Sequence, residues 1–226
     1  MSKFFAFPTQ NSWEEDVFQL TTAGIITVVG IIVALIAIAL FIRSREESKK
    51  ISTKQLVFSA AAMALGTVAS MIKFLKLPMG GSITLFSMLF IVLIGYWYGT
   101  KVGIMTAIAY GLLQFVIEPV FYSIPQMIVD YPLAFGALGL SGFFQNSKHG
   151  LIKGYIAGVL GRYVFAFLSG LLFFAAYAQG SGMSAPIYSL AYNGSYLLTE
   201  AVVTLVVIAI PAVNHALKHI KKVACE

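Results

Sequence analysis

The chain has 226 residues, of which 59% are hydrophobic and only 11% are charged. A soluble globular domain averages about 25% charged residues, so this composition excludes a water-soluble fold and indicates a polytopic membrane protein. The net charge of +6 does not indicate nucleic-acid binding, because the lysines and arginines lie in short segments between apolar runs. The single cysteine, Cys225, excludes an internal disulfide and a thiolate metal cluster.

A helix that crosses the hydrocarbon needs about 20 predominantly apolar residues. The first such segment, Thr22–Ile42, is uncharged and is expected to be an anchor helix, followed by the charged linker Arg43–Lys54. Six further spans are predicted at Gln55–Phe74, Ser82–Tyr98, Val102–Phe121, Pro125–Phe143, Leu151–Ala178 and Pro186–Leu217. The last two exceed what a perpendicular helix needs, so we expect a tilt, a kink or a protruding end. The predicted fold class is an all-α integral membrane protein, with a six-helix core preceded by one extra N-terminal transmembrane helix.

The distribution of positive charge between these spans predicts the orientation of the chain. If the linker after the anchor is cytoplasmic, eleven lysines and arginines lie inside and three lie outside. This bias follows the positive-inside rule, so we expect the N-terminus outside the cell and the C-terminus in the cytoplasm.

Arg162, Glu200 and Asp130 are charged side chains that lie away from the ends of predicted spans, where a charge is costly and therefore indicates a functional site. Arg162 and Glu200 lie near mid-depth, and antiparallel packing of their helices would let them form a structural ion pair at the floor of a pocket. The alternative is that one of them contacts a ligand. Asp130, near the outer end of its span, is then the carboxylate expected to face a cationic ligand.

The residues around these charges favour a flat, partly cationic aromatic ligand. Arg162, Ala166, Gly170 and Phe174 are spaced by four and share one helix face. Tyr131, Phe174 and Tyr188 could stack on such a ligand, although each aromatic could instead face lipid. Asn193, which shares a face with Glu200, could donate and accept hydrogen bonds at a ring edge.

The chain shows little sign of catalysis. It has no Gly-rich phosphate loop of the G-x-x-x-x-G-K type and no H-E-x-x-H pattern. His215 and His219 are four residues apart but lie among lysines, which is typical of a solvated helix end. We therefore expect no enzyme activity, no metal site and no cofactor. Ala60 and Ala64 have the small-xxx-small spacing of close helix contacts, either within the fold or with another subunit.

The region from about Gln55 to Lys222 resembles the ThiT family, the thiamine-specific substrate-binding (S) components of energy-coupling factor (ECF) transporters. The resemblance lies in the segments LPMGGSITLFSM (Leu77–Met88), DYPLAFGALGLSG (Asp130–Gly142), GRYVFAFLSGLLFF (Gly161–Phe174) and YSLAYNGSY (Tyr188–Tyr196). It implies a six-helix vitamin-binding domain at residues 55–222, preceded by an N-terminal part (1–54) and followed by a short tail (223–226).

The resemblance implies a protein of the bacterial plasma membrane that captures a vitamin from outside the cell. Its partners would be a transmembrane coupling protein and two cytoplasmic ATPase subunits, which would use the ATP. Ala60 and Ala64 would then lie on the surface that docks on the coupling protein.

The resemblance also implies roles for single residues. Asp130 would face the aminopyrimidine and the thiazolium of the ligand, followed by Tyr131 as in the family. Phe174 would stack on the ligand, and Tyr188 and Asn193 would hydrogen-bond the pyrimidine edge.

Ala166 departs from the family pattern, because thiamine-binding members carry a histidine four residues before Gly170. The smaller side chain would enlarge the pocket and remove a stacking group. Hydroxymethylpyrimidine and vitamin B6 therefore stay open as ligands beside thiamine. A membrane scaffold or regulatory subunit is an alternative of another class. A secondary transporter is less favoured, since neither inverted repeats nor broken helices stand out.

Overall fold

The computed structural model describes residues 6–10, 16–23, 26, 51–77, 81–179 and 181–226. The predicted anchor helix Thr22–Ile42 lies outside the described residues except for Thr22, Ala23 and Ile26, which are helical. The chain divides into two compact units. The larger unit comprises residues 51–166 and 191–226, and the smaller unit comprises residues 167–190 with the described part of 1–50.

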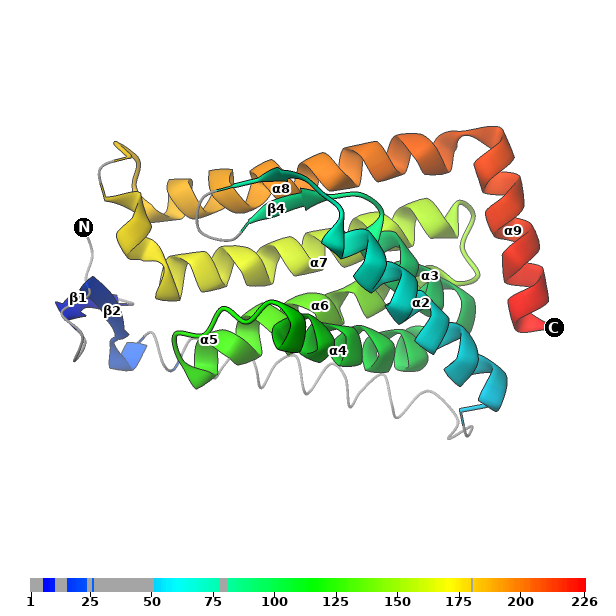
Figure 1. The fold of residues 1–226 in the computed structure, drawn as a ribbon, viewed down its shortest axis with the longest axis horizontal. Helices are drawn as coiled ribbons and strands as arrows, with labels where there is room; N and C mark the ends of the chain where they lie inside the picture. The colour runs from blue at the N-terminus through cyan, green and yellow to red at the C-terminus, as the bar shows by residue number, and fades with distance from the viewer. Residues whose placement is uncertain (1–5, 11–15, 24–25, 27–50, 78–80, 180) are drawn as a thin grey trace. The chain divides into compact units, whose positions relative to one another are not determined.

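The described part of the chain is predominantly helical (Figure 1). Its α-helices are α2 (Thr53–Met71), α3 (Ser87–Tyr98), α4 (Thr100–Ile117), α5 (Ile124–Ile128), α6 (Ala134–Gly136), α7 (Gly150–Phe173), α8 (Ala185–Ala209) and α9 (Pro211–Cys225). A π-helical segment, η2 (Val129–Leu133), joins α5 to α6, and the 3₁₀ segments are η3 (Ala137–Phe144) and η4 (Ala175–Ala178).

Two short antiparallel hairpins accompany the helices. Strands β1 (Ala6–Gln10) and β2 (Asp16–Leu20) pair with Pro8 opposite Phe18. Strands β3 (Lys73–Lys76) and β4 (Ser82–Thr84) pair with Leu75 opposite Ile83. The helical membrane fold class is thus confirmed, with these hairpins as additions that the hydropathy pattern did not predict.

Four helical stretches are long and apolar enough to cross a bilayer, namely Thr100–Ile117, Ile124–Phe144, Gly150–Phe173 and Ala185–Ala209. The predicted span Ser82–Tyr98 is shorter than expected, because Ser82–Thr84 form β4 and Phe86 adopts a left-handed conformation at φ 64°. The apolar helix α3 therefore has only 12 residues. The predicted count of six spans is not established by helix length and composition in the described residues.

The predicted span Pro186–Leu217 is two helices in the structure. Helix α8 ends at Ala209 and α9 begins at Pro211. Proline has no backbone N–H and disfavours a helical conformation for the preceding residue, and Ile210 is extended at ψ 124°. The expected kink is therefore a complete break, and α9 turns away from α8 (Figure 1).

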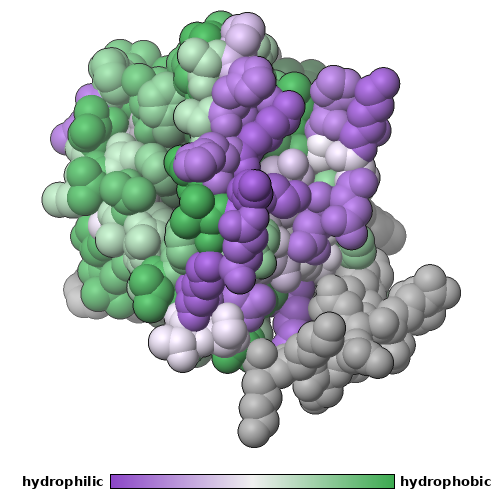
Figure 2. Space-filling model, turned by 90° about the vertical axis from the view of Figure 1, so that its right-hand side faces the viewer, coloured by the Kyte–Doolittle hydropathy of each residue, from purple (hydrophilic) through white to green (hydrophobic). Residues whose placement is uncertain are grey.

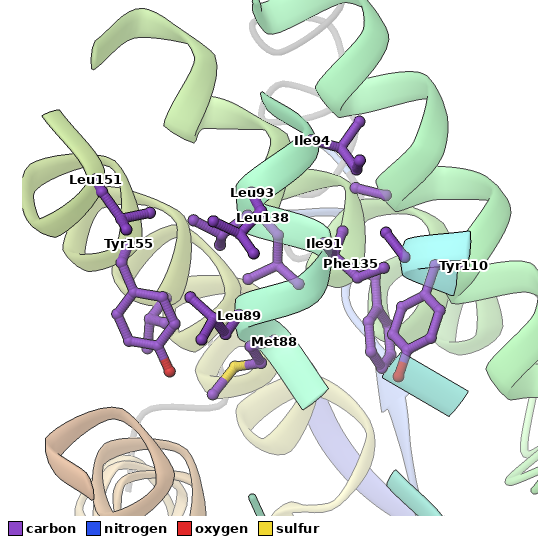
Figure 3. Close-up of a cluster of buried hydrophobic side chains, with 14 of the residues drawn as sticks. Met88, Leu89, Ile91, Leu93, Ile94, Tyr110, Phe135, Leu138, Leu151 and Tyr155 are labelled. Atoms are coloured by element: carbon purple, nitrogen blue, oxygen red, sulfur yellow. The ribbon is translucent and has the colours of Figure 1, made fainter. Parts of the chain in front are cut away.

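The core of the larger unit forms around α3, whose side chains are buried on nearly all sides. A helix that is apolar all round is expected only where other elements cover every face. Figure 3 shows Tyr110 of α4 and Phe135 of α6 on one side of α3, with Leu151 and Tyr155 of α7 on the other. The Tyr110 and Phe135 rings meet edge to face, with centroids 5.4 Å apart.

Glycines allow η3 to approach the start of α4. A Cβ atom on Gly142 would overlap the backbone of Gly99 and Thr100, and one on Gly139 would overlap the backbone of Ile104. Such backbone contact is the usual way in which helices associate in lipid, where there is no hydrophobic drive between them. This packing fixes the segment that carries Asp130 against the core.

Candidate ligand-binding site

Asp130 lies in the π-helical segment η2, which contains Pro132. Because proline lacks an N–H, it interrupts the regular hydrogen-bond ladder of a helix, and a wider turn accommodates the interruption. Single π turns of this kind occur frequently at functional sites. Asp130, whose carboxylate is predicted to face a ligand, therefore lies on an irregular turn. Its side chain is half-buried.

Gln126 sets the position of the Asp130 carboxylate. Its side chain is fully buried, and its Nε2 donates to Asp130 Oδ2 at 2.5 Å and to the carbonyl of Val120 at 3.1 Å. Its Oε1 accepts from the backbone N–H of Tyr122 at 3.0 Å. The amide thus ties Asp130 to the connector between α4 and α5. Gln126 was not predicted as a site residue, although its position four residues before Asp130 was a signal in the sequence.

Tyr131, the neighbour of Asp130, makes its polar contacts within the protein. Its side chain is buried in the core, with the ring centroid 4.9 Å from that of Phe115. Its hydroxyl donates to the carbonyl of Glu118 and accepts from the N–H of Val120, both at 2.9 Å. These bonds occupy the polar end of Tyr131, which anchors the same connector as Gln126. This arrangement favours a positioning role over direct ligand contact.

Asn193 and Ala166 meet where α8 crosses α7. The Nδ2 atom of the buried Asn193 donates to the carbonyl of Ala166 at 3.2 Å, and its Oδ1 accepts from Tyr196 at 2.7 Å. Ala166, which differs from the histidine of the family pattern, therefore lies next to Asn193, the residue predicted to hydrogen-bond the ligand. At this crossing the small Ala166 side chain leaves its backbone accessible to Asn193.

The predicted ion pair between Arg162 and Glu200 is wrong. Glu200 is buried, and its carboxylate accepts hydrogen bonds from Thr84 Oγ1 at 2.7 Å, Ser87 Oγ at 2.9 Å and Met88 N at 3.2 Å. Ser87 and Met88 open α3, whose cap residue Phe86 gives no side-chain hydrogen bond. Glu200 therefore accepts from a buried amide at the start of α3 that has no partner within the helix, at a helix end where negative charge is favoured.

Arg162 interacts with an aromatic ring instead of a carboxylate. Its guanidinium carbon lies 3.9 Å from the centroid of Phe135. A guanidinium over an aromatic face is attracted by the ring quadrupole, more strongly where water is excluded. Arg162 thus packs α7 against α6, and the two ion pairs found among the described residues are Lys73–Glu118 and Lys222–Glu226.

The remaining predicted residues belong to the smaller unit, where α7 ends and α8 begins. Phe174 directly follows α7 and stacks on Tyr177, with ring centroids 6.1 Å apart and an interplanar angle of 18°. Tyr188 packs on a small alanine cluster that includes Ala175 and Ala178. Gly170, Phe174 and Tyr188 are half-buried. The structure thus groups these three in one unit and Asp130, Tyr131, Ala166 and Asn193 in the other.

Helix α2 shows one buried and one exposed face. Ser59, Ala62 and Gly66 are buried against the larger unit, whereas Ala60 and Ala64 are exposed. The exposed face continues through Val57, Leu65, Val68 and Met71. The predicted small-residue stripe is therefore not used for packing within the described fold.

Comparison with known proteins decides the family. The family model described as "Thiamine transporter protein (Thia_YuaJ)" matches residues 56–220. The chain belongs to this family. A relative named thiamine transporter ThiT from Bacillus subtilis is 33% identical over 168 residues, covering 68% of this chain and 85% of the relative. A second relative of that name, from Lacticaseibacillus paracasei, is 33% identical over 128 residues, covering 50% of this chain and 61% of the relative.

A solved structure agrees with this assignment. The structure described as ThiT from Listeria monocytogenes has a TM-score of 0.62 and 26% sequence identity. The match covers 75% of this chain and 96% of the solved one. The chain is thus a multi-pass membrane protein of the Thia_YuaJ family, and the predicted resemblance to ThiT-like proteins is confirmed.

Proposed function

We propose that this chain binds thiamine as the substrate-capture S component of an ECF importer and is not itself an enzyme. The observation that carries the proposal is the family match over residues 56–220, which spans Asp130, Ala166, Phe174 and Asn193. In this proposal residues 55–222 form the vitamin-binding domain. Ligand entry is from outside the cell, with the N-terminus outside and the C-terminus in the cytoplasm, as the distribution of lysines and arginines favours.

The proposed chemistry of recognition rests on the roles that the family resemblance implies for single residues. The Asp130 carboxylate supplies the negative charge for the thiazolium, in a half-buried position where charge interactions are weakly screened. Phe174 supplies an aromatic face, and Tyr188 supplies a hydroxyl for the pyrimidine edge. Gly170 leaves room for the ring beside them. Asn193 already donates to the Ala166 carbonyl and accepts from the Tyr196 hydroxyl, so it orders its surroundings in addition to any bond with the ligand.

The direct test is a calorimetric titration of the purified full chain with thiamine. We expect saturable one-to-one binding that is tighter than the binding of pyridoxine. Thermal unfolding of the same sample provides the control that the protein is folded. If no vitamin gives a heat of binding with protein that unfolds cooperatively, the vitamin-binding function is excluded. A scaffold or regulatory function would then remain.

Ala166 supports a second candidate ligand, hydroxymethylpyrimidine, because the pocket lacks the imidazole of thiamine-binding members. The same titration discriminates between the two ligands. Binding of hydroxymethylpyrimidine at least as tight as that of thiamine would favour the precursor. In that case Ala166→His would shift the preference back toward thiamine.

The exposed small-residue face of α2 supports docking on a transmembrane coupling protein that works with two ATPase subunits. Ala64→Trp would place an indole in this close contact, and overpacking a helix contact costs about 1–3 kcal/mol. We expect vitamin uptake and co-purification of the partner subunits to fall by roughly five- to 150-fold, while ligand binding is unchanged.

The matched control is Met105→Trp, at a position on α4 that is 52% exposed and outside the α2 face. It adds an indole to an exposed position of α4 and should leave uptake unchanged. Equal uptake by both variants would show that Ala64 is not at the docking surface.

A further inference from the structure

The larger unit contains a cavity of about 290 Å³ whose lining includes none of the residues proposed to bind the vitamin. It lies beside the start of α7 and the first half of α9, and its lining includes Tyr96, Lys148, His149, Asn214, Leu217 and Lys218. This volume is many times the roughly 10–15 Å³ that one water molecule needs by the same measure, so the space can take a group larger than water. The side chains of two lysines and one asparagine, together with the apolar side chains of Tyr96 and Leu217, thus surround one space.

The position of the cavity along the spans matches the headgroup layer of a bilayer. Helix α7 is a candidate span that begins at Gly150, directly after Lys148 and His149. Helix α8 is a candidate span that ends at Ala209, and α9 follows with Asn214, Leu217 and Lys218. Both sides of the cavity are therefore built by residues that lie at, or just beyond, the ends of helices.

Helix α9 has the faces of a helix that lies at a membrane surface. Val213, Leu217 and Ala224 turn toward the protein, and the Tyr98 hydroxyl donates to the Ala224 carbonyl at 3.0 Å. A second face carries the exposed Ala216, Ile220 and Val223. A third carries the exposed His215, Lys218, His219 and Lys222. Adjacent exposed apolar and basic faces are typical of interfacial helices.

The lysines around the cavity differ in what they already contact. Lys221 donates to the Gln145 carbonyl at 2.8 Å and lies 3.8 Å from the centroid of Tyr96, so it serves the packing of α9. Lys222 pairs with Glu226 at 3.7 Å. Lys148 and Lys218 instead line the cavity and are exposed. Figure 2 shows hydrophilic side chains gathered on this end of the molecule.

We propose that this cavity binds the phosphate headgroup of an anionic phospholipid, with Lys148 and Lys218 as its cationic contacts. Asn214 supplies a polar contact, and Leu217 packs against the glycerol. Basic pockets between transmembrane helices commonly hold anionic headgroups, and each lysine near the surface contributes an attraction of about 1 kcal/mol. The inference goes beyond the proposed vitamin binding and does not depend on it.

The test uses the full chain in neutral detergent, titrated with short-chain phosphatidylglycerol while thermal unfolding is followed. A ligand that binds only the folded state raises the unfolding temperature, and the titration gives an apparent affinity. We expect Lys148→Gln with Lys218→Gln to weaken this affinity by about fivefold per lysine, hence about 25-fold together. Short-chain phosphatidylcholine should give no comparable stabilisation.

The matched control is Lys76→Gln with Lys222→Gln, which removes the same charge from positions outside the cavity and should leave the affinity within about twofold of wild type. Equal weakening in both double variants would assign the effect to net charge and overturn the proposal. Equal stabilisation by inorganic phosphate or by phosphatidylcholine would overturn it as well. Wild-type affinity in the cavity variant, with loss of co-purified ATPase subunits, would assign the surface to a protein partner.

An independent readout needs no variant. Wild-type protein extracted from nanodiscs of equal parts phosphatidylglycerol and phosphatidylcholine should retain phosphatidylglycerol selectively in native mass spectra. High salt should reduce this retention, because exposed charges are screened. Retention of both lipids in equal amounts would contradict the proposed site.

Discussion

Asp130→Asn is expected to weaken thiamine binding by well over tenfold. The substitution preserves the size of the side chain and removes only its negative charge. Truncating one partner of a buried charge pair costs about 2–5 kcal/mol, and even the lower value corresponds to roughly 30-fold in affinity. Calorimetric titration of the purified variant with thiamine measures the effect.

The environment of Asp130 makes this substitution informative. Gln126 remains to hold the new amide, since the Asn oxygen can accept from Nε2 as the carboxylate does. The fold should therefore survive, which thermal unfolding checks. Hydroxymethylpyrimidine carries no fixed positive charge, so its affinity should fall less than that of thiamine. Equal loss for both ligands would indicate a distorted pocket instead of a missing counter-ion.

Glu118→Gln is the matched control for the charge. Glu118 lies at the end of α4, is 57% exposed and pairs with Lys73. Removing its charge changes the net charge of the protein by the same amount as Asp130→Asn. An exposed ion pair contributes about 0–1 kcal/mol, so thiamine affinity should be nearly unchanged. Unchanged affinity in Asp130→Asn itself would show that this carboxylate is not the counter-ion.

The sequence predicted the features that depend on composition and local spacing. The apolar runs placed the starts of the long helices α4, α7 and α8 within two residues, but the predicted ends lie four, five and eight residues too far along the chain. The family motifs marked the segment around Asp130. Helix periodicity correctly placed Asn193 and Glu200 on one buried face of α8. Each of these predictions used residues of a single segment, where helix geometry fixes their relation.

The partners of the buried charges depended on tertiary structure and were missed. Glu200 had one nearby opposite charge in the predicted helix pair, so Arg162 was the obvious partner. Its carboxylate instead accepts hydrogen bonds from Thr84 and Ser87, which lie more than 110 residues earlier in the chain. Hydroxyl and amide donors can satisfy a buried carboxylate as well as a cation can, and no periodicity in the sequence marks them.

The irregular elements at two prolines were also not predicted from hydropathy. Pro132 and Pro211 each interrupt a helical pattern, but the results differ. Pro132 is accommodated by a π turn inside a longer helical stretch, whereas Pro211 begins a new helix. Hydropathy continues through both prolines, so it cannot separate a widened turn from a break. The surrounding packing decides between them, through glycines such as Gly139 and Gly142 that hold η3 against α4.

The role of Glu200 gives the second large prediction. Glu200→Ala removes the acceptor of three hydrogen bonds at the start of α3 and leaves Thr84, Ser87 and the Met88 amide buried without it. Loss of a charged hydrogen-bond partner costs about 1.5–3 kcal/mol for each bond, with less than additive effects. We expect destabilisation of about 3–5 kcal/mol, measured by unfolding of the purified chain. Val202→Ala, at a position 61% exposed on the same helix, is the control and should have little effect.

A double-mutant cycle separates this capping role from an ion pair with Arg162. Glu200→Ala combined with Thr84→Val should show a coupling energy within the ~0.5–3 kcal/mol found for residues that share a hydrogen bond. The same cycle with Arg162→Met should show a smaller coupling, because that guanidinium lies over Phe135. Arg162→Met keeps most of the stem that packs on the ring, so loss of packing does not obscure the charge effect. Stronger coupling of Glu200 to Arg162 than to Thr84 would restore the ion pair and remove Glu200 from the cap of α3.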